Sequence, residues 1–167
     1  AGFNTAIGSC SLYTNTTGTY NIAIGARALY ANTTSGANVA IGYASLFCNT
    51  AGANTAVGYA ALYKNTTGSE NTASGYDALA CNTTASYNTA MGWKALRENS
   101  TGNLNAAFGR TALTSNTTGN QNTALGTQAM QNNTTGDYNT ASGYLASYNN
   151  TTGSHNTSYG RHALRCN

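Results

Sequence analysis

The sequence predicts an all-β fold, a parallel β-solenoid of ten coils. Three observations lead to this prediction: one motif of about 17 residues fills the chain, Asn and Gly recur at fixed places in it, and its apolar residues recur in register. Such repeats bury their apolar side chains only by stacking on their neighbours. The chain is therefore a single repeat array, 1-167, whose copies begin at residues 4, 21, 38, 54, 71, 88, 105, 122, 139 and 156.

The repeat reads Asn-Thr-Ala-x-Gly-x-x-Ala-Leu-x-x-Asn-Thr-Thr-Gly-x-x, and we number its positions 1 to 17 from the first Asn. Positions 2 to 4 predict a short strand, with positions 2 and 4 on one face and the Ala of position 3 on the other. The Gly of position 5 occurs in every copy, which indicates a special backbone shape or a close backbone approach. Ala-Leu at positions 8 and 9 predicts a second strand. Asn-Thr-Thr-Gly predicts a turn in which Asn bonds its own backbone and Gly supplies positive φ; the third copy is one residue shorter there, at 49-53.

A helical repeat is disfavoured, because only about six residues separate the Gly of position 5 from the turn Asn, and isolated helices that short are marginal. In a solenoid, residues of equal position stack into ladders about 4.8 Å apart, so ten rungs form a rod of about 48 Å. We expect a buried Leu ladder and hydrogen-bonded Asn ladders. In the middle coils the ladder residues are Asn54, Gly58, Leu62, Asn65, Asn71, Gly75, Leu79 and Asn82.

Aromatic residues recur at two positions, in four consecutive coils each. Both rows predict stacked ladders that stabilise neighbouring rungs. A second interpretation of the first row is a flat strip that binds glycans or surfaces. The rows are Tyr43, Tyr59, Tyr76 and Trp93 at position 6, and Tyr13, Tyr30, Phe47 and Tyr63 at position 10.

The turn asparagines also sit in glycosylation sequons. Sugars on rungs about 4.8 Å apart would collide, which favours the Asn ladder over glycosylation. Cys48 and Cys81 share one position two coils apart, near 10 Å, so a disulfide between them is not expected and any bridge must join two chains. Eight turn asparagines lie in such sequons: Asn15, Asn32, Asn65, Asn82, Asn99, Asn116, Asn133 and Asn150.

The sequence predicts no enzyme, no cofactor and no metal site. The carboxylates Glu70, Asp77, Glu98 and Asp137 occupy different repeat positions, so we expect no shared face for them. The four cysteines lack metal-ligand spacing. The basic residues are scattered, which disfavours nucleic acid. No stretch approaches the roughly 20 apolar residues that cross a membrane, so we expect no membrane insertion.

Two segments, Asn21–Gly25 and Asn38–Gly42, resemble the Val-Ala-Ile-Gly core of trimeric autotransporter adhesin heads. The whole unit, over essentially all of the chain, resembles the repeat arrays of phage tail-fibre-like proteins. The resemblance implies a left-handed parallel β-roll with three chains about a common axis. The adhesin-head repeat is shorter, so a larger coil that closes its own core and stays single remains the alternative.

The sequence therefore predicts a structural fibre or filament segment, or an adhesin shaft, located extracellularly or on a virion surface. Its partners are other copies of itself, in a head-to-tail filament or a homotrimer, and cell-surface glycans. Neither end of the array looks capped, which favours head-to-tail contact. The alternatives are a carbohydrate-binding solenoid that uses the strip at position 6 and an ice-binding solenoid. The latter would use the threonines of position 2, which Ile22, Val39 and Ala106 interrupt: Thr5, Thr55, Thr72, Thr89, Thr123, Thr140 and Thr157.

Overall fold

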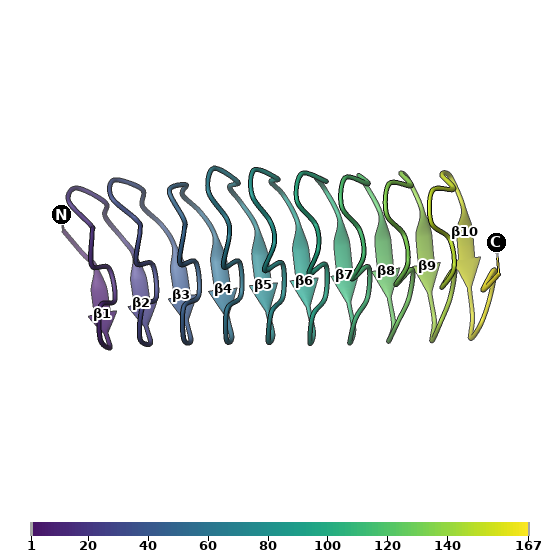
Figure 1. Cartoon of the computed structure of the whole chain (residues 1–167), viewed down its shortest axis with the longest axis horizontal. Coiled ribbons are helices and arrows are strands. Elements are labelled where there is room, and N and C mark those ends of the chain that lie inside the picture. Colours follow the sequence, from purple (N-terminus) through teal and green to yellow (C-terminus); the bar gives the residue numbers. More distant parts are fainter. Residues whose placement is uncertain (1, 167) are drawn as a thin grey trace.

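The computed structural model describes residues 2–166, which form one rod of stacked coils with a strand in each coil (Figure 1). The ten strands make a single parallel sheet in chain order. They are β1 (Thr5–Ile7), β2 (Ile22–Ile24), β3 (Val39–Ile41), β4 (Thr55–Val57), β5 (Thr72–Ser74), β6 (Thr89–Met91), β7 (Ala106–Phe108), β8 (Thr123–Leu125), β9 (Thr140–Ser142) and β10 (Thr157–Tyr159). The predicted all-β solenoid is confirmed, with about nine turns from the first strand to the last.

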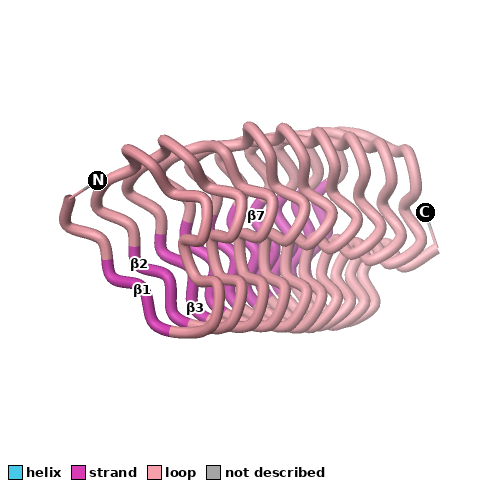
Figure 2. The backbone as a smooth tube through the Cα atoms, turned by 60° about the vertical axis from the view of Figure 1, so that its left-hand side comes forward, coloured by secondary structure: helices cyan, strands magenta, loops and turns pink. Residues whose placement is uncertain are grey.

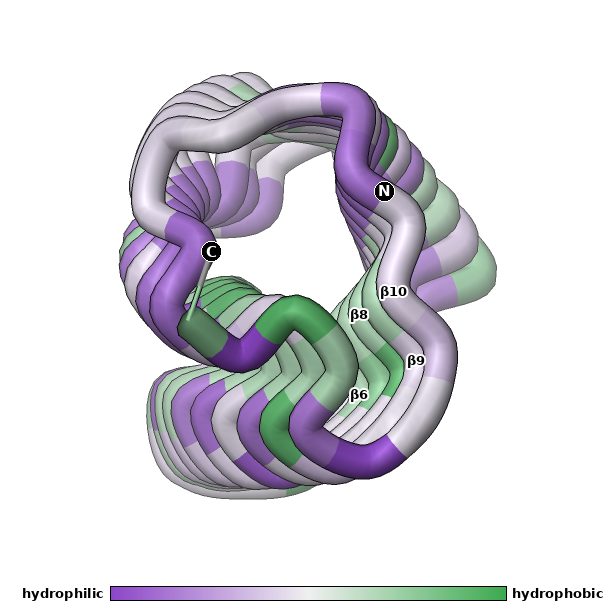
Figure 3. Tube along the Cα trace, turned by 90° about the vertical axis from the view of Figure 1, so that its right-hand side faces the viewer, coloured by the Kyte–Doolittle hydropathy of each residue, from purple (hydrophilic) through white to green (hydrophobic). Residues whose placement is uncertain are grey.

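Equal repeat positions pair across the whole sheet. Ala56 lies opposite Ala73, and the short third copy does not disturb this register, because Val39 still pairs with Thr55. Strands occupy one side of every coil and loops the rest (Figure 2). Viewed from the C-terminal end, the chain runs clockwise as it approaches the viewer, so the coil is left-handed (Figure 3).

The predicted second strand at positions 8 and 9 is wrong. Positions 6 to 11 form tight turns, because positions 7 and 9 adopt left-handed backbone conformations, with φ 54° at Asp77 and 51° at Leu79. Left-handed residues other than Gly cost about 1–3 kcal/mol each. Stacking offsets this cost: the N–H of Leu79 donates to the carbonyl of Ala95 at 3.0 Å, and the Leu79 side chain is fully buried.

The expectation that the turn Gly of position 15 supplies positive φ is also wrong. The left-handed residue of this turn is at position 17, for example Glu70 with φ 57°. The Gly of position 15 instead permits a close approach, because a Cβ on Gly68 would lie 2.1 Å from the carbonyl oxygen of Ala85. Ser35, Ala51 and Ala85 itself occupy this position in other coils, so a small side chain is accommodated there.

The apolar core is a column between the sheet and the turns. In the middle coils it consists of the Ala of position 3, the Ala of position 8 and the Leu of position 9, as in Ala73, Ala78 and Leu79, all fully buried. Figure 3 shows this apolar column in green in the lower half of the cross-section. The predicted Leu ladder is therefore confirmed, and the strand turns its Ala face inward and positions 2 and 4 outward.

The two end coils expose the cross-section of this core. Ala6 in β1 is exposed, and Leu164 in the last coil is 44% exposed, whereas their equivalents in the middle coils are fully buried. Residues 2–166 contain no helix, hence none that is long and apolar enough to cross a membrane.

Candidate functional site

Two asparagine ladders fill the half of the coil that the apolar column leaves. Asn82 at position 12 donates through Nδ2 to Oδ1 of Asn65 at 2.7 Å, as predicted. At position 1, the backbone N–H of Asn71 donates to Oδ1 of Asn54 at 3.0 Å. Both ladders meet on one carbonyl oxygen, that of Ala85, which accepts from Asn71 at 2.8 Å and from Asn82 at 2.9 Å. These asparagines are structural, and their amides are not available to a ligand.

The short third copy breaks the ladder of position 12 once. The turn there lacks one residue, so Nδ2 of Asn49 bonds the carbonyl of Ala51 at 2.6 Å instead of reaching the preceding rung. Oδ1 of Asn32 consequently has no hydrogen-bond partner, although it is buried. The ladder resumes in the next coil, where Asn65 donates to Asn49 at 2.7 Å.

The glycine row of position 5 is required by the backbone, as predicted. Gly75 has φ 138°, and a Cβ on it would lie 2.4 Å from the carbonyl oxygen of Gly92. Gly58 repeats this geometry against Gly75 at 2.5 Å. The row has a packing role and brings no functional group to the surface.

The first candidate surface is the outer sheet face, which we define as the side chains of positions 2 and 4 in β1 to β10. Its apolar residues are accessible to solvent: Ile41, Met91 and Leu125 are 37%, 44% and 53% exposed. No residue of the face is charged. The apolar members of position 4 are Ile7, Ile24, Ile41, Val57, Met91, Phe108 and Leu125. Ser74 and Ser142 interrupt this row at β5 and β9. A row with this many exposed apolar side chains is typical of an interaction surface.

Position 2 of the same face carries the threonines that the sequence singled out. Thr55, Thr72 and Thr89 point outward from three consecutive strands, in register with one another across β4, β5 and β6. Ile22, Val39 and Ala106 take the same position in β2, β3 and β7, so apolar residues interrupt the threonine row at two places along the rod.

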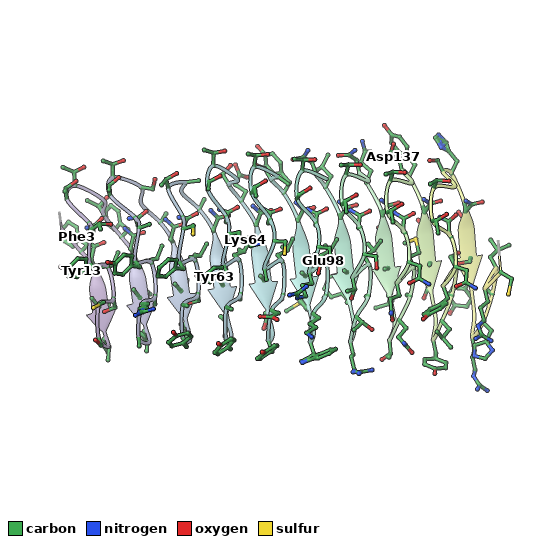
Figure 4. All side chains as sticks on the ribbon, in the orientation of Figure 1. Phe3, Tyr13, Tyr63, Lys64, Glu98 and Asp137 are labelled. Carbon is green, nitrogen blue, oxygen red and sulfur yellow. The ribbon has the colours of Figure 1, made fainter. Side chains whose placement is uncertain are left out.

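The predicted aromatic ladder at position 10 forms completely, and the one at position 6 forms over three of its four members. At position 10, Tyr13, Tyr30, Phe47 and Tyr63 stack with ring centroids 5.0–5.3 Å apart and planes within 10° (Figure 4). At position 6, Tyr59 stacks on Tyr43 at 5.2 Å and on Tyr76 at 5.0 Å.

Trp93 differs from the other members of the position-6 row. Its ring lies beneath two cations, with Nζ of Lys94 at 4.3 Å and the guanidinium carbon of Arg110 at 4.9 Å from the ring centroid. These cation–π contacts place positive charge on the ring face. The strip of Tyr43, Tyr59, Tyr76 and Trp93 therefore consists of a stack of tyrosines followed by a covered tryptophan.

The second candidate surface is a groove of about 330 Å³ between the two aromatic rows, which we call the trough. Tyr43 and Tyr59 of the position-6 row line it, together with Phe47 and Tyr63 of the position-10 row. Its remaining lining residues are Arg27, Ala44, Ala60, Lys64, Asp77, Ala80, Cys81 and Arg97.

Charged groups gather at one end of the trough. Nε of Arg97 lies 3.5 Å from Oδ2 of Asp77, and its Nη1 contacts Oε1 of Glu98. The expectation that the carboxylates share no face is therefore wrong for Asp77 and Glu98, which approach the same guanidinium from successive coils. Because Arg97 and Asp77 are 20 residues apart, coil stacking brings together positions that differ in the repeat.

Four thiols are free in the structure, as expected for Cys48 and Cys81. Burial raises the pKa of Cys48 above its ordinary value, although Lys64 opposes this. Burial, followed by the charge of Glu98, raises the pKa of Cys81 despite the nearby Lys64 and Arg97. These thiols stay protonated near neutral pH, where a nucleophile must ionise. Residues 2–166 hold no group of three or more His, Cys, Asp or Glu side chains that could bind a metal ion.

Two surfaces escaped the sequence prediction. The trough becomes visible only when the coils are aligned, because it requires that the two aromatic rows overlap above small residues. A second threonine row, at position 14, is exposed in every turn between consecutive strands except the short third one. Its members are Thr17, Thr34, Thr67, Thr84, Thr101, Thr118, Thr135 and Thr152.

Comparison with known proteins gives no further assignment: no protein-family model, no curated protein and no solved structure matches the chain.

Proposed function

We propose that the chain is a structural fibre or filament segment whose copies associate side by side through the outer sheet face. The observation that carries this proposal is the row of exposed apolar side chains at position 4, among them Ile41 and Leu125. Removing apolar surface from water stabilises association by about 25 cal/mol per Å². The resemblance to tail-fibre and adhesin repeats supports an extracellular or virion location for such a segment.

The occupant that fits this face best is another copy of the chain. Two rods share the same rung period, so their apolar rows remain matched over their full length. The face carries no charge that would have to be desolvated in a contact. The strand backbones of the middle coils already pair within their own sheet, so association requires only side-chain packing.

Light scattering on the purified chain tests this proposal. We expect a multimer for the natural sequence and a monomer for the double variant Ile41→Lys/Val57→Lys, which places two cations on the outer sheet face. The matched control is Thr84→Lys/Thr101→Lys, which adds the same charges at exposed sites of position 14 and should leave the multimer intact. A natural chain that stays monomeric at millimolar concentration would contradict the proposal. A multimer that survives the first double variant would indicate stacking of end coils instead.

Ice binding is a second candidate, because β4, β5 and β6 present Thr55, Thr72 and Thr89 outward in register. A monomeric rod would leave these hydroxyl groups free to order water, whereas a multimer through the same face would cover them. The two functions therefore exclude each other on this surface. Thermal hysteresis that Thr72→Tyr abolishes and Thr84→Tyr does not would support ice binding, and its absence at millimolar protein would remove it.

A further inference from the structure

The position of the trough on the rod follows from where the two aromatic rows overlap. Tyr144 and Tyr148 occupy positions 6 and 10 in coil 9, where position 7 is the bulky Leu145. The position-6 row spans coils 3 to 6 and the position-10 row coils 1 to 4, so the two rows overlap in coils 3 and 4. In these two coils position 7 is Ala44 and Ala60, whereas Arg27 and Asp77 occupy it on either side. The result is a two-coil depression with an alanine floor, aromatic walls and charged ends.

The walls present ring edges and hydroxyl groups, because the rings stack along each row: Phe47 and Tyr59 have a ring on both faces, and Tyr43 and Tyr63 have a ring on one face. Tyr59, for example, has a ring stacked on both sides, at 5.2 and 5.0 Å. Ring edges carry partial positive charge. Within residues 2–166, the hydroxyls of Tyr43, Tyr59 and Tyr63 have no protein hydrogen-bond partner, although they line a concave surface. These walls therefore suit a ligand with many hydroxyl groups and a negative charge.

The charged residues of the trough agree with this requirement. Arg97 is engaged with Asp77 and Glu98. Arg27, at the opposite end, has no carboxylate within salt-bridge distance in the part of the chain that the structure describes, and neither has Lys64. A guanidinium binds a carboxylate through two parallel hydrogen bonds. The open end of the trough is thus complementary to a carboxylate.

We propose that the trough binds an acidic sugar residue of a polysaccharide. Its carboxylate pairs with Arg27, its C–H surface packs on Ala44 and Ala60, and its hydroxyl groups bond those of Tyr43, Tyr59 and Tyr63. The volume of about 330 Å³ lies at the lower end of the range for ligand sites, about 300–1,000 Å³, and fits a short segment of a glycan chain. This inference adds a ligand to the fibre role proposed above, and it leaves the outer sheet face free.

Binding of oligogalacturonate and oligohyaluronate, measured by calorimetry beside their methyl esters, tests this proposal. The esters keep the sugar backbone and lose the charge. We expect at least one acid to bind, its ester to bind about tenfold more weakly or worse, and Arg27→Gln to remove the difference. Ala60→Leu fills the trough and should abolish binding of both forms. Leu145 occupies the same repeat position in coil 9, so this backbone accepts Leu.

The matched control is Gln128→Leu, which places Leu at position 7 in coil 8, outside the trough, and should bind as the natural chain does. Equal binding of acid and ester, unchanged binding by Ala60→Leu, or no binding of either acid would overturn the proposal. A single-stranded oligonucleotide that competes equally well would overturn the assignment to a sugar. Because light scattering on the same variants reports assembly separately, failure here is distinguishable from failure of the proposed fibre role.

Discussion

Nδ2 of Asn82 donates a hydrogen bond of 2.7 Å to Oδ1 of Asn65, and Oδ1 of Asn82 accepts one of 3.1 Å from Asn99 in the next coil. From Asn65 to Asn133, each amide of the position-12 ladder thus uses its donor toward one neighbour and its acceptor toward the other. All three residues are fully buried. The geometry requires an amide at every rung, because only Asn offers both functions at this length.

Replacing Asn82 with Asp removes the donor and should destabilise the rod in a pH-dependent way. The ionised carboxylate of N82D would face two acceptors, Oδ1 of Asn65 and the carbonyl of Ala85, in a buried site. Burial and these acceptors raise its folded pKa above the unfolded value of about 3.9, so N82D should be most stable below that pH and lose stability as pH rises through the folded pKa. Urea unfolding at pH 3.5 and pH 7, roughly either side of that window, measures the difference.

The control for this prediction is Asn103→Asp. Asn103 is half-exposed at position 16, where Oδ1 accepts from the backbone N–H of Ser86 at 2.8 Å. Asp137 occupies the same position naturally and accepts from the N–H of Asn120 at 2.6 Å. N103D should therefore stay close to the natural chain at both pH values. Equal pH dependence of the two variants would contradict a buried amide ladder.

The buried ladder also predicts the glycosylation state in an exporting host. Asn65 and Asn82 are inaccessible to solvent and to enzymes in the folded rod, since both are at 0% exposure and bonded inside the coil. A glycan on either amide is incompatible with the stacked rungs. When the folded, secreted chain is treated with a glycosidase, mass spectrometry should show no loss of mass at either of these two sites. A folded rod with a glycan on Asn82 would refute the ladder.

Gly75→Val should cost more than about 1 kcal/mol of stability. The residue has φ 138°, and its new Cβ would lie 2.4 Å from the carbonyl oxygen of Gly92, so backbone strain and a clash act together. Gly160→Val separates the two effects, because Gly160 has φ 115° but no heavy atom within 4 Å of an added Cβ. The free energy of unfolding, measured by chemical denaturation, should be much lower for Gly75→Val than for Gly160→Val. If Gly75→Val leaves the free energy of unfolding unchanged, the glycine row has no packing role.

Leu79→Ala should cost about 2–5 kcal/mol, because Leu79 is fully buried in the apolar column. Leu125→Ala removes the same atoms from the outer sheet face, where the side chain is 53% exposed, and should change coil stability by only about 0.5 kcal/mol. Urea unfolding of both variants under monomeric conditions measures this contrast. Similar losses for the two would show that the Leu ladder is not the core.

Much of this architecture followed from periodicity, because a stacked fold copies each residue choice along the rod. The strand at Thr72–Ser74, the ladder residues Leu79 and Asn82 and the aromatic stacks were all predicted from register. The second strand was not predicted correctly. Ala and Leu have no preference for left-handed conformations, so nothing local indicates φ 51° at Leu79; stacking imposes it.

The candidate sites could be predicted from the repeat pattern of the sequence less completely than the fold. The trough depends on which residues face each other across different repeat positions, as with Tyr59, Tyr63 and the Ala60 between them. The meeting of Asp77 and Glu98 at Arg97 likewise joins three positions of the repeat. The repeat pattern in the sequence shows to which coil each residue belongs. The path of the turns, which the pattern does not show, decides which repeat positions lie next to one another in space.

The last coils contain a buried polar pair where the ladders predict apolar residues. Ser147 replaces Leu at position 9 and Ser158 replaces Ala at position 3, and their hydroxyl oxygens lie 2.8 Å apart. Both side chains are buried, at 1% and 4% exposure. Removing one hydroxyl leaves the other unpaired, so Ser158→Ala should cost about 1–3 kcal/mol.

Removing both hydroxyl groups should cost less than the sum of the single changes, because no polar group is then left without a partner. The double variant Ser147→Leu/Ser158→Ala restores the Leu and Ala of the middle coils and should equal or exceed the natural chain in stability, since burial of Leu replaces one hydrogen bond. Hydrogen exchange of the last two coils gives the local free energy for each variant. Additive losses in the double variant would show that the two serines act independently, and the 2.8 Å contact would then contribute nothing to this end of the rod.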